Sequence, residues 1–210
     1  MSLPAWAVLL LAYLLGSFPT AHLVGKANGV DLRTVGSGNL GATNVFRTLG
    51  WKWGLAVYVA DFLKGVIPVI WLAPHTRSGV VGPDAWAMAA GITAIAGHVR
   101  PVFLLGKGGG KGVATASGVF AALAPLPAAC AIGAFAVTVA LTRYVSLGSI
   151  VGAGALALVL QVTAFNTPMA WVGTAVSLFV VFTHRDNIRR LLRGEERRIG
   201  ASSAKEASAS

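Results

Sequence analysis

The chain of 210 residues has one cysteine, Cys130, so no disulfide can form within it. It has only seven acidic residues, and they are too scattered for the aspartate-rich motif that would hold a metal-bound diphosphate. No paired histidine or cysteine spacing is present, which argues against a zinc site. Charged residues make up 11% of the chain, against roughly a quarter in ordinary soluble domains. These shortages exclude a typical soluble domain, and we expect no metal and no other cofactor.

Apolar residues fill the chain instead. They make up 55% of it, and the mean hydropathy is +0.72. The apolar runs are continuous, rich in Leu, Ala and Val, and helical in length, whereas an outer-membrane barrel needs alternating polar and apolar residues. The composition therefore predicts an all-α integral membrane protein. In such a protein a net charge of +10 does not indicate nucleic acid, because the distribution of Lys and Arg between loops carries the information.

Seven membrane-crossing helices are expected. The first, residues 3–24, is about long enough to cross a hydrocarbon core of roughly 30 Å. Because no basic residue precedes it, we expect a retained helix rather than a cleaved signal peptide. Gly16, Ser17 and Pro19 indicate a kink or close packing near its end. Further crossings are expected at residues 51–73, 85–98, 146–163 and 168–183.

The run between Lys111 and Arg143 has 31 residues, too many for one upright crossing and barely enough for two. Pro125 and Pro127 divide it, so we expect two short helices joined by the proline pair. A single tilted helix would instead reverse the direction of every later segment. The two-helix interpretation completes the seven crossings.

Basic residues gather on one side of this topology. Fifteen lie there, namely Lys26, Arg33, Arg47, Lys52, Arg100, Lys107, Lys111, Arg143 and the seven after Thr183. The opposite side has only Arg77. Because cytoplasmic loops are enriched in Lys and Arg, we expect the N-terminus outside and the C-terminus in the cytoplasm. Residues 1–196 then form one membrane domain, and residues 197–210 a disordered polar tail.

Three polar clusters share the predicted cytoplasmic face, and the first, residues 35–50, reads V-G-S-G-N-L-G-A-T-N-V-F-R-T-L-G. Its glycines let backbone N–H groups turn inward, and its side chains offer neutral hydrogen bonds and one forked guanidinium. This combination favours binding of an oxyanion such as phosphate. A surface loop with tight turns is the alternative. The candidate binding residues are Ser37, Gly38, Asn39, Thr43, Asn44 and Arg47.

The second cluster, residues 97–115, reads G-H-V-R-P-V-F-L-L-G-K-G-G-G-K-G-V-A-T. Two lysines flank three glycines in a cationic loop, and this loop opens a helix whose amide groups and dipole favour an anion. It is not a Walker A loop, because Gly112 stands where that motif has Ser or Thr. The candidate binding residues here are Lys107, Gly108, Gly109 and Lys111.

The third cluster, residues 183–196, contains His184 and Asn187 one helical turn apart, so their side chains can point the same way. A short basic helix on an anionic lipid surface explains the arginines of this cluster. It does not explain the histidine and the asparagine, which we therefore treat as candidate site residues.

Charged residues also lie inside a predicted crossing. Asp61 and Lys64 are three residues apart and share a helical face, and exposure of either to lipid would be costly. A mutual ion pair that only packs the bundle is one interpretation. A supporting role at the site, shared with His98, is the other.

Together the three clusters resemble the motifs of the bacterial acyl-phosphate:glycerol-3-phosphate acyltransferases, the PlsY family, in the same order and with similar spacing. The resemblance implies a multi-pass enzyme of the bacterial cytoplasmic membrane with its site on the cytoplasmic face. It implies transfer of an acyl group from acyl phosphate to position 1 of glycerol 3-phosphate, giving lysophosphatidic acid in the first step of phospholipid synthesis. The implied catalytic residues are Ser37, His184 and Asn187. The implied phosphate-binding cations are Arg47 and one of Lys107 and Lys111.

The sequence departs from the family pattern in two places. The usual lysine, two glycines, lysine run has an extra glycine, which leaves open which lysine has the family role. Arg100 stands where family members often have an aromatic residue. The expected partners are acyl phosphate, glycerol 3-phosphate and the lipid bilayer.

Direct transfer without an acyl-enzyme is expected. An acyl phosphate is already an activated donor, so holding two phosphates and aligning a hydroxyl group can suffice. The proton can go to His184 or to a phosphate oxygen, and the resemblance favours the phosphate. A transporter or channel for an anionic metabolite is the alternative class, and it would carry polar groups through the membrane midplane rather than gather them at one face.

Overall fold

The computed structural model describes residues 2–77 and 82–200 of the chain. Its α-helices are α1 (Ala5–Ser17), α2 (Thr20–Ala27), α3 (Ala42–Leu49), α4 (Trp51–Ile67), α5 (Pro83–Val99), α6 (Val113–Leu123), α7 (Pro125–Thr142), α8 (Val145–Thr163), α9 (Pro168–Thr183) and α10 (Arg185–Leu192). Short helical turns cover Pro68–Leu72, Ala73–His75 and Val102–Leu104. The two-residue strands β1 (Leu3–Pro4) and β2 (Thr76–Arg77) pair in parallel. The helical architecture predicted from composition is confirmed.

Five helical stretches of the described part are long and apolar enough to cross a membrane: Ala5–Ala27, Trp51–His75, Asp84–Leu104, Pro125–Thr142 and Val145–Thr163. Val113–Leu123 and Pro168–Thr183 are apolar but shorter, about 16 Å and 24 Å at 1.5 Å per residue. Each predicted crossing therefore coincides with an apolar helical stretch, and the short ones are α6 and α9.

The first stretch breaks where the sequence predicted a kink. α1 ends at Ser17 and α2 begins at Thr20, because Pro19 has no N–H to continue the helical hydrogen bonds. At the break, the backbone carbonyl of Phe18 accepts hydrogen bonds from the Thr20 N–H at 3.0 Å and from Lys64 Nζ at 2.6 Å. The break between α1 and α2 thus allows a contact with α4.

The proline pair begins α7 rather than joining two short helices. Ala124 leaves the helical conformation, with φ −147° and ψ 74°, and Pro125 and Pro127 stand in the first turn of α7. Proline is tolerated there because the first N–H groups of a helix have no partner within the helix. The expectation of two helices is confirmed, but only α6 is short, with 11 residues against 18 in α7.

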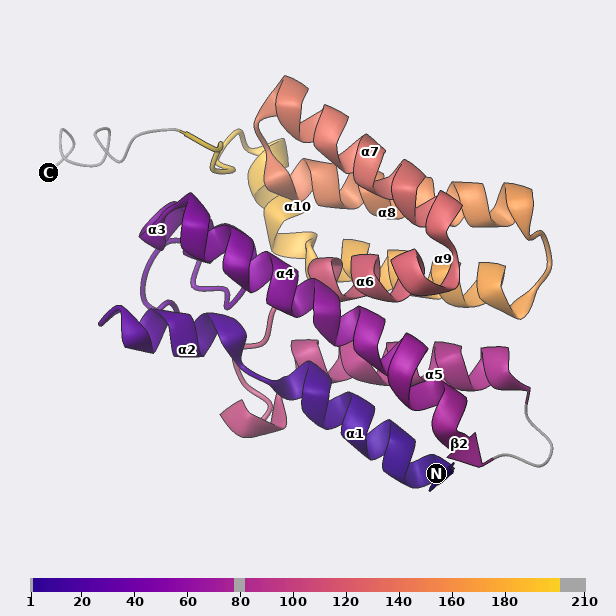
Figure 1. Cartoon of the computed structure of the whole chain (residues 1–210). Coiled ribbons are helices and arrows are strands. Elements are labelled where there is room, and N and C mark those ends of the chain that lie inside the picture. Colours follow the sequence, from indigo (N-terminus) through magenta and orange to yellow (C-terminus); the bar gives the residue numbers. More distant parts are fainter. Residues whose placement is uncertain (1, 78–81, 201–210) are drawn as a thin grey trace, which may run out of the picture.

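The polar elements collect at one end of the bundle. In Figure 1, α2, α3 and α10 lie at one end, whereas the N-terminus and the connection between α8 and α9 lie at the other. Of the predicted disordered tail, residues 201–210 lie outside the described residues. The preceding residues, 197–200, are described, and several of them are hydrogen-bonded to the rest of the chain. The polar end is where the three sequence clusters meet.

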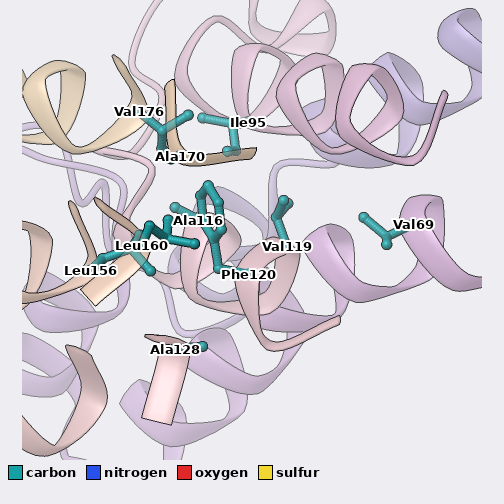
Figure 2. Close-up of a cluster of buried hydrophobic side chains, with 10 residues drawn as sticks. All are labelled: Val69, Ile95, Ala116, Val119, Phe120, Ala128, Leu156, Leu160, Ala170 and Val176. Atoms are coloured by element: carbon teal, nitrogen blue, oxygen red, sulfur yellow. The ribbon is translucent and has the colours of Figure 1, made fainter. Parts of the chain in front are cut away.

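The short helix α6 forms the centre of the core. It packs against α4, α5, α7 and α9, and its Phe120 is the largest fully buried side chain among the described residues. Figure 2 shows the α6 side chains between Leu156 and Leu160 of α8 on one side and Val69 on the other. Because α6 spans only part of the bundle, the loop before it reaches inward and carries polar residues to a buried position.

Two glycines allow α4 and α6 to approach each other closely. A Cβ at Gly65 would overlap the carbonyl oxygen of Thr115, and one at Gly118 would overlap that of Phe62. Small residues permit such approach between membrane helices. The result places Asp61 of α4 beside the start of α6, where Thr115 Oγ1 donates a hydrogen bond to its backbone carbonyl at 3.0 Å.

Candidate functional site

A polar cavity lies where the three sequence clusters meet. It is lined by Ser37, Asn39, Gly41, Ala42, Thr43, Asn44, Arg47, Tyr58, Asp61, His98, Lys111, Gly112, Val113, Ala114, Phe135, Val145, Ser146, Ser149, His184, Asn187 and Glu196. Most of the residues predicted for the site are in this set. Those outside it are Gly38, Lys64, Lys107, Gly108 and Gly109.

Asn44 shapes the first loop from within. Its Nδ2 donates to the carbonyl oxygens of Leu32 at 3.0 Å and Val35 at 3.2 Å, and its Oδ1 accepts from the backbone N–H of Ser37 at 2.8 Å. A Cβ at Gly36 would overlap this Oδ1, and Gly36 has φ +61°, so glycine is required there. The amide of Asn44 therefore fixes the loop that carries Ser37 to the cavity.

Arg47 brings a guanidinium to the cavity from α3. Its Nη2 donates to the carbonyl oxygen of Arg197 at 2.9 Å, across 150 positions of sequence. Its Nε is buried and has no hydrogen-bond partner within the part of the chain that the structure describes. Burial lowers the pKa of Arg47, although the nearby Glu196 carboxylate opposes this shift. The guanidinium thus keeps a buried donor for a ligand oxygen.

Lys111, and not Lys107, supplies the cation of the second loop. Lys111 lines the cavity and donates through Nζ to Asn187 Oδ1, whereas Lys107 is exposed and lies outside the lining. Burial lowers the pKa of Lys111 to about 8, and Glu196 opposes the shift. The structure therefore separates the two lysines that the extra glycine had left equivalent in the sequence.

The glycine run lies directly against the end of α5. A Cβ at Gly110 would overlap His98 Nε2, and one at Gly109 would overlap the carbonyl oxygen of Val99. Gly108 has φ +74°. Gly108 and Gly109 line a smaller pocket, which includes Lys64 and shares Asp61 and His98 with the main cavity. The position of Gly108 and Gly109 makes them spacers that set where Lys111 enters the main cavity.

His184 is a neutral acceptor at the cavity wall. Its Nδ1 lies 2.7 Å from the carbonyl oxygen of Val180, and because a carbonyl only accepts, the proton is on Nδ1 and Nε2 carries the lone pair. Burial and the nearby Lys111 lower the pKa of His184 to about 4. At neutral pH the imidazole can therefore accept a hydrogen bond through Nε2.

Glu196 is a site residue that the sequence reasoning did not find. Its Oε1 accepts from Ser146 Oγ at 2.8 Å and from Asn187 Nδ2 at 2.7 Å, and its Oε2 accepts from Arg190 Nε at 2.7 Å. Burial raises the pKa of Glu196, but these hydrogen bonds outweigh burial and lower it. By taking the Nδ2 of Asn187, Glu196 turns the Oδ1 of that amide toward Lys111.

Of the charged pair inside the bundle, Asp61 lines the cavity and Lys64 lies outside the lining. Lys64 Nζ is 2.6 Å from Asp61 Oδ1, and both side chains are buried. His98 Nδ1 lies 3.8 Å from the same oxygen. The ion pair expected from the spacing is confirmed. Because Asp61 and His98 also line the cavity, the supporting role remains open to them as a prediction.

An apolar groove continues from the polar cavity between α6, α7, α8 and α9. Tyr58, Val113, Phe135 and Ser149 line both. The rest of the groove is lined by Ala116, Ser117, Phe120, Ala128, Ala131, Ile132, Gly152, Ala153, Leu156, Val176, Ser177 and Val180. The site is therefore amphipathic, with cationic side chains at one end and apolar side chains at the other.

Comparison with known proteins identifies the family. A family model described as glycerol-3-phosphate acyltransferase matches residues 6–194. The glycerol-3-phosphate acyltransferase of Geotalea daltonii is 48% identical over 185 residues, covering 88% of this chain and 92% of the relative. That of Geobacter sulfurreducens is 44% identical over 191 residues, covering 91% and 95%. The chain belongs to the glycerol-3-phosphate acyltransferase family.

Two solved structures of this family share the fold. The crystal structure of PlsY (YgiH), an integral membrane glycerol 3-phosphate acyltransferase, in its glycerol 3-phosphate form has a TM-score of 0.85 and 38% identity, covering 98% of this chain and 99% of that one. The lysophosphatidic acid form has a TM-score of 0.82 at 38% identity, covering 93% and 95%. The resemblance drawn from the three clusters is confirmed, and so is the class of acyltransferase rather than transporter.

The departures from the acyltransferase motifs lie outside the cavity lining. Arg100 is exposed, its Nη1 donates to the carbonyl oxygen of Gly106 at 3.4 Å, and its own carbonyl accepts from Tyr13 at 2.7 Å. The extra glycine belongs to the run packed on His98. Within the described residues, no three His, Cys, Asp or Glu side chains lie close enough together to hold a metal ion.

Proposed function

We propose that the protein transfers an acyl group from acyl phosphate to the 1-hydroxyl of glycerol 3-phosphate and releases lysophosphatidic acid and inorganic phosphate. The observation that carries this proposal is the continuity of the cation-lined cavity with the apolar groove. An acyl phosphate has a dianionic head and a hydrocarbon tail, and each matches one half of the site. Glycerol 3-phosphate brings a second phosphate and no tail.

The reaction needs one bond made and one broken at the acyl carbonyl. The glycerol hydroxyl oxygen attacks the carbonyl carbon, the bond from that carbon to the phosphate oxygen breaks, and the hydroxyl proton leaves with the phosphate. Arg47 and Lys111 are the cations that would hold the phosphate groups in the cavity. Ser37 and Asn187 would place the reacting groups, since proximity is the main requirement when the donor is already activated.

The proton goes to a phosphate oxygen rather than to His184. The departing phosphate gains basicity as its bond to the carbonyl carbon breaks, and even a phosphate monoester has a second pKa of about 6, whereas the pKa of His184 is lowered to about 4 by burial and by Lys111. The imidazole is then the weaker base of the two. Its Nε2 would accept a hydrogen bond from the attacking hydroxyl and orient it, which makes His184 a positioning group.

The transfer is direct. A covalent route would need a nucleophile with a base beside it. Cys130 is exposed on α7 and does not line the cavity. Ser37 is at the cavity, but His184 is too weakly basic to activate it efficiently. No acyl-enzyme is therefore proposed.

The cavity opens to the cytoplasm in this proposal. All seven apolar stretches cross the membrane, the N-terminus is outside, and α3 and α10 lie at the cytoplasmic end of the bundle in the bacterial inner membrane. The support is the positive charge of the loops at that end, together with the clustering of α2, α3 and α10 at one end of Figure 1. Soluble glycerol 3-phosphate then reaches the site from water, and the acyl tail from lipid.

The donor is tested by offering acyl phosphate and acyl-CoA side by side to the purified protein with glycerol 3-phosphate and without added metal. Lysophosphatidic acid should form from acyl phosphate and survive chelation. Product from acyl-CoA alone, or complete loss of product on chelation, would contradict the proposed donor.

A further inference from the structure

The segment 196–199, here called the strap, follows α10 and runs beside the start of α8. At one end, Glu196 accepts a hydrogen bond from Ser146 at 2.8 Å. At the other end, the backbone N–H of Ile199 donates to the carbonyl of Arg143 at 2.8 Å, and Arg143 Nε donates to the carbonyl of Ile199 at 3.0 Å. Hydrogen bonds at both ends fix the main chain between them.

The carbonyl oxygen of Arg197 lies between these two anchors and accepts from Arg47 Nη2 at 2.9 Å. The guanidinium has five N–H donors in a fixed plane, so one bond at its tip restricts the directions of the others. One of those others, the buried Nε of Arg47, has no partner among the described residues, and Arg47 lines the polar cavity. The strap therefore holds the tip of a side chain that has a donor left for a ligand.

A free arginine side chain loses much rotamer freedom when it binds a ligand, and a side chain already held loses less. We propose that the strap is a positioning element, and that the main-chain carbonyl of Arg197 orients Arg47 for the phosphate of a substrate. This inference rests on the proposed phosphate-binding role of Arg47. It gives a purpose to residues beyond 196 that the sequence assigned to a disordered tail.

The test compares three purified proteins: the full chain, a form ending at Gly200 and a form ending at Glu196. Ending at Glu196 keeps the side-chain carboxylate and its partners, removes the Arg197 carbonyl, and leaves a terminal main-chain carboxylate one residue earlier. We expect this form to have a Michaelis constant raised about 3- to 10-fold for one phosphate substrate, with kcat within about twofold. The form ending at Gly200 should match the full chain. Unchanged Michaelis constants for both substrates in the form ending at Glu196 overturn the proposal.

Arg47→Lys identifies the substrate concerned. It should raise the Michaelis constant for the same substrate, and adding it to the form ending at Glu196 should give no further rise, because both changes remove one function. If the effects of Arg47→Lys and of the truncation on the Michaelis constant multiply in the combined variant, the strap does not act through Arg47. If Arg47→Lys alone moves neither constant, the phosphate-binding role assigned to Arg47 fails. If the Michaelis constant rises in Arg47→Lys but not in the form ending at Glu196, only the positioning role of the strap is refuted.

Two further variants separate the carbonyl from side chains and from folding. Arg197→Lys keeps both the carbonyl and the positive charge that acts on Arg47, and it should leave both Michaelis constants within about twofold, so an effect as large as that of truncation would overturn the proposal. The double variant Arg143→Gln/Ile199→Pro keeps the full chain length but removes both hydrogen bonds at the far end of the strap. If the form ending at Glu196 does not fold, this variant decides, and an unchanged Michaelis constant in a folded protein contradicts the role.

Discussion

Lys111 and Lys107 form a matched pair for measuring what the cavity requires. Both are lysines of one loop, four residues apart, but Lys111 lines the polar cavity and Lys107 is exposed. Replacing either by methionine keeps an unbranched apolar stem and removes the charge. The two variants therefore differ in position and hardly at all in chemistry.

The expected losses of kcat/KM differ by at least about sixfold. Truncating one partner of a desolvated charge pair costs about 2–5 kcal/mol, so kcat/KM of Lys111→Met should fall about 30- to 4000-fold. An exposed lysine contributes at most about 1 kcal/mol to a charge interaction, so Lys107→Met should lose less than about fivefold. The variant at position 111 also leaves Asn187 Oδ1 without its donor.

The pH dependence gives an independent check on Lys111. Its pKa is lowered to about 8, so the ammonium is charged below that pH and loses its proton as the pH rises through it. In the unmodified enzyme kcat/KM for the phosphate substrate should therefore decline above about pH 8. In Lys111→Arg any remaining activity should lack that decline, since a guanidinium stays charged.

The assay is the initial rate of lysophosphatidic acid formation from acyl phosphate and glycerol 3-phosphate in detergent or lipid, with a melting temperature for each variant. Equal losses in Lys111→Met and Lys107→Met would refute the assignment of Lys111. So would a large loss confined to Lys107→Met.

Three other predictions follow from the same geometry. Gly110→Ala should reduce activity at least tenfold because its methyl group would meet His98, whereas Gly133→Ala, with open space around it on α7, should keep full activity and helix stability; equal activity in both would contradict the packing argument. Glu196→Gln should also lose more than tenfold, and because the folded-state pKa of Glu196 is lowered, its stabilisation is present above about pH 4.5 and lost as the pH falls further. The melting temperature should therefore fall more steeply below pH 4.5 in the unmodified protein than in Glu196→Gln. Parallel curves of melting temperature against pH would contradict stabilisation by the ionised Glu196. For topology, single cysteines at Gly79 and Ser202 in a Cys130→Ala background, both outside the described residues, should be labelled from outside at position 79 only; the reverse pattern would overturn the orientation.

The sequence was sufficient to predict the helical class and most of the cavity. Long apolar runs require helices in lipid, since every backbone group must be paired within the segment. Polar residues such as Ser37 and His184 then stand out between the apolar runs, and their grouping into clusters marks them as candidate site residues. Three such clusters on one predicted face had to meet if the bundle closed.

What the sequence could not give depends on contacts across distant segments. Lys107 and Lys111 are equivalent by type and spacing, and only the short α6 and the packing of Gly110 on His98 separate them. Glu196 looked like one more charge in a basic surface helix, and its burial follows from hydrogen bonds to Ser146 on α8. Only the arginines on both sides of the Glu195–Glu196 pair could have suggested an ion-pair partner.

The apolar groove was beyond the sequence for a different reason. Its lining residues, such as Ile132 and Leu156, are ordinary membrane-helix residues, and nothing in their type separates a groove from a packed core. The extent of α6 and α7 was also missed, because a proline pair is compatible with a connection and with the first turn of a helix. The packing of the helices determines both the groove and the extent of α6 and α7.

The central claim is that one site holds both substrates and transfers the acyl group directly between them. Varying acyl phosphate and glycerol 3-phosphate together measures this, with intact-protein mass spectrometry on enzyme that has received the donor alone. We expect intersecting lines in the double-reciprocal plot and an unchanged protein mass. Parallel lines, or an acyl mass on Ser37 when glycerol 3-phosphate is withheld, would contradict direct transfer.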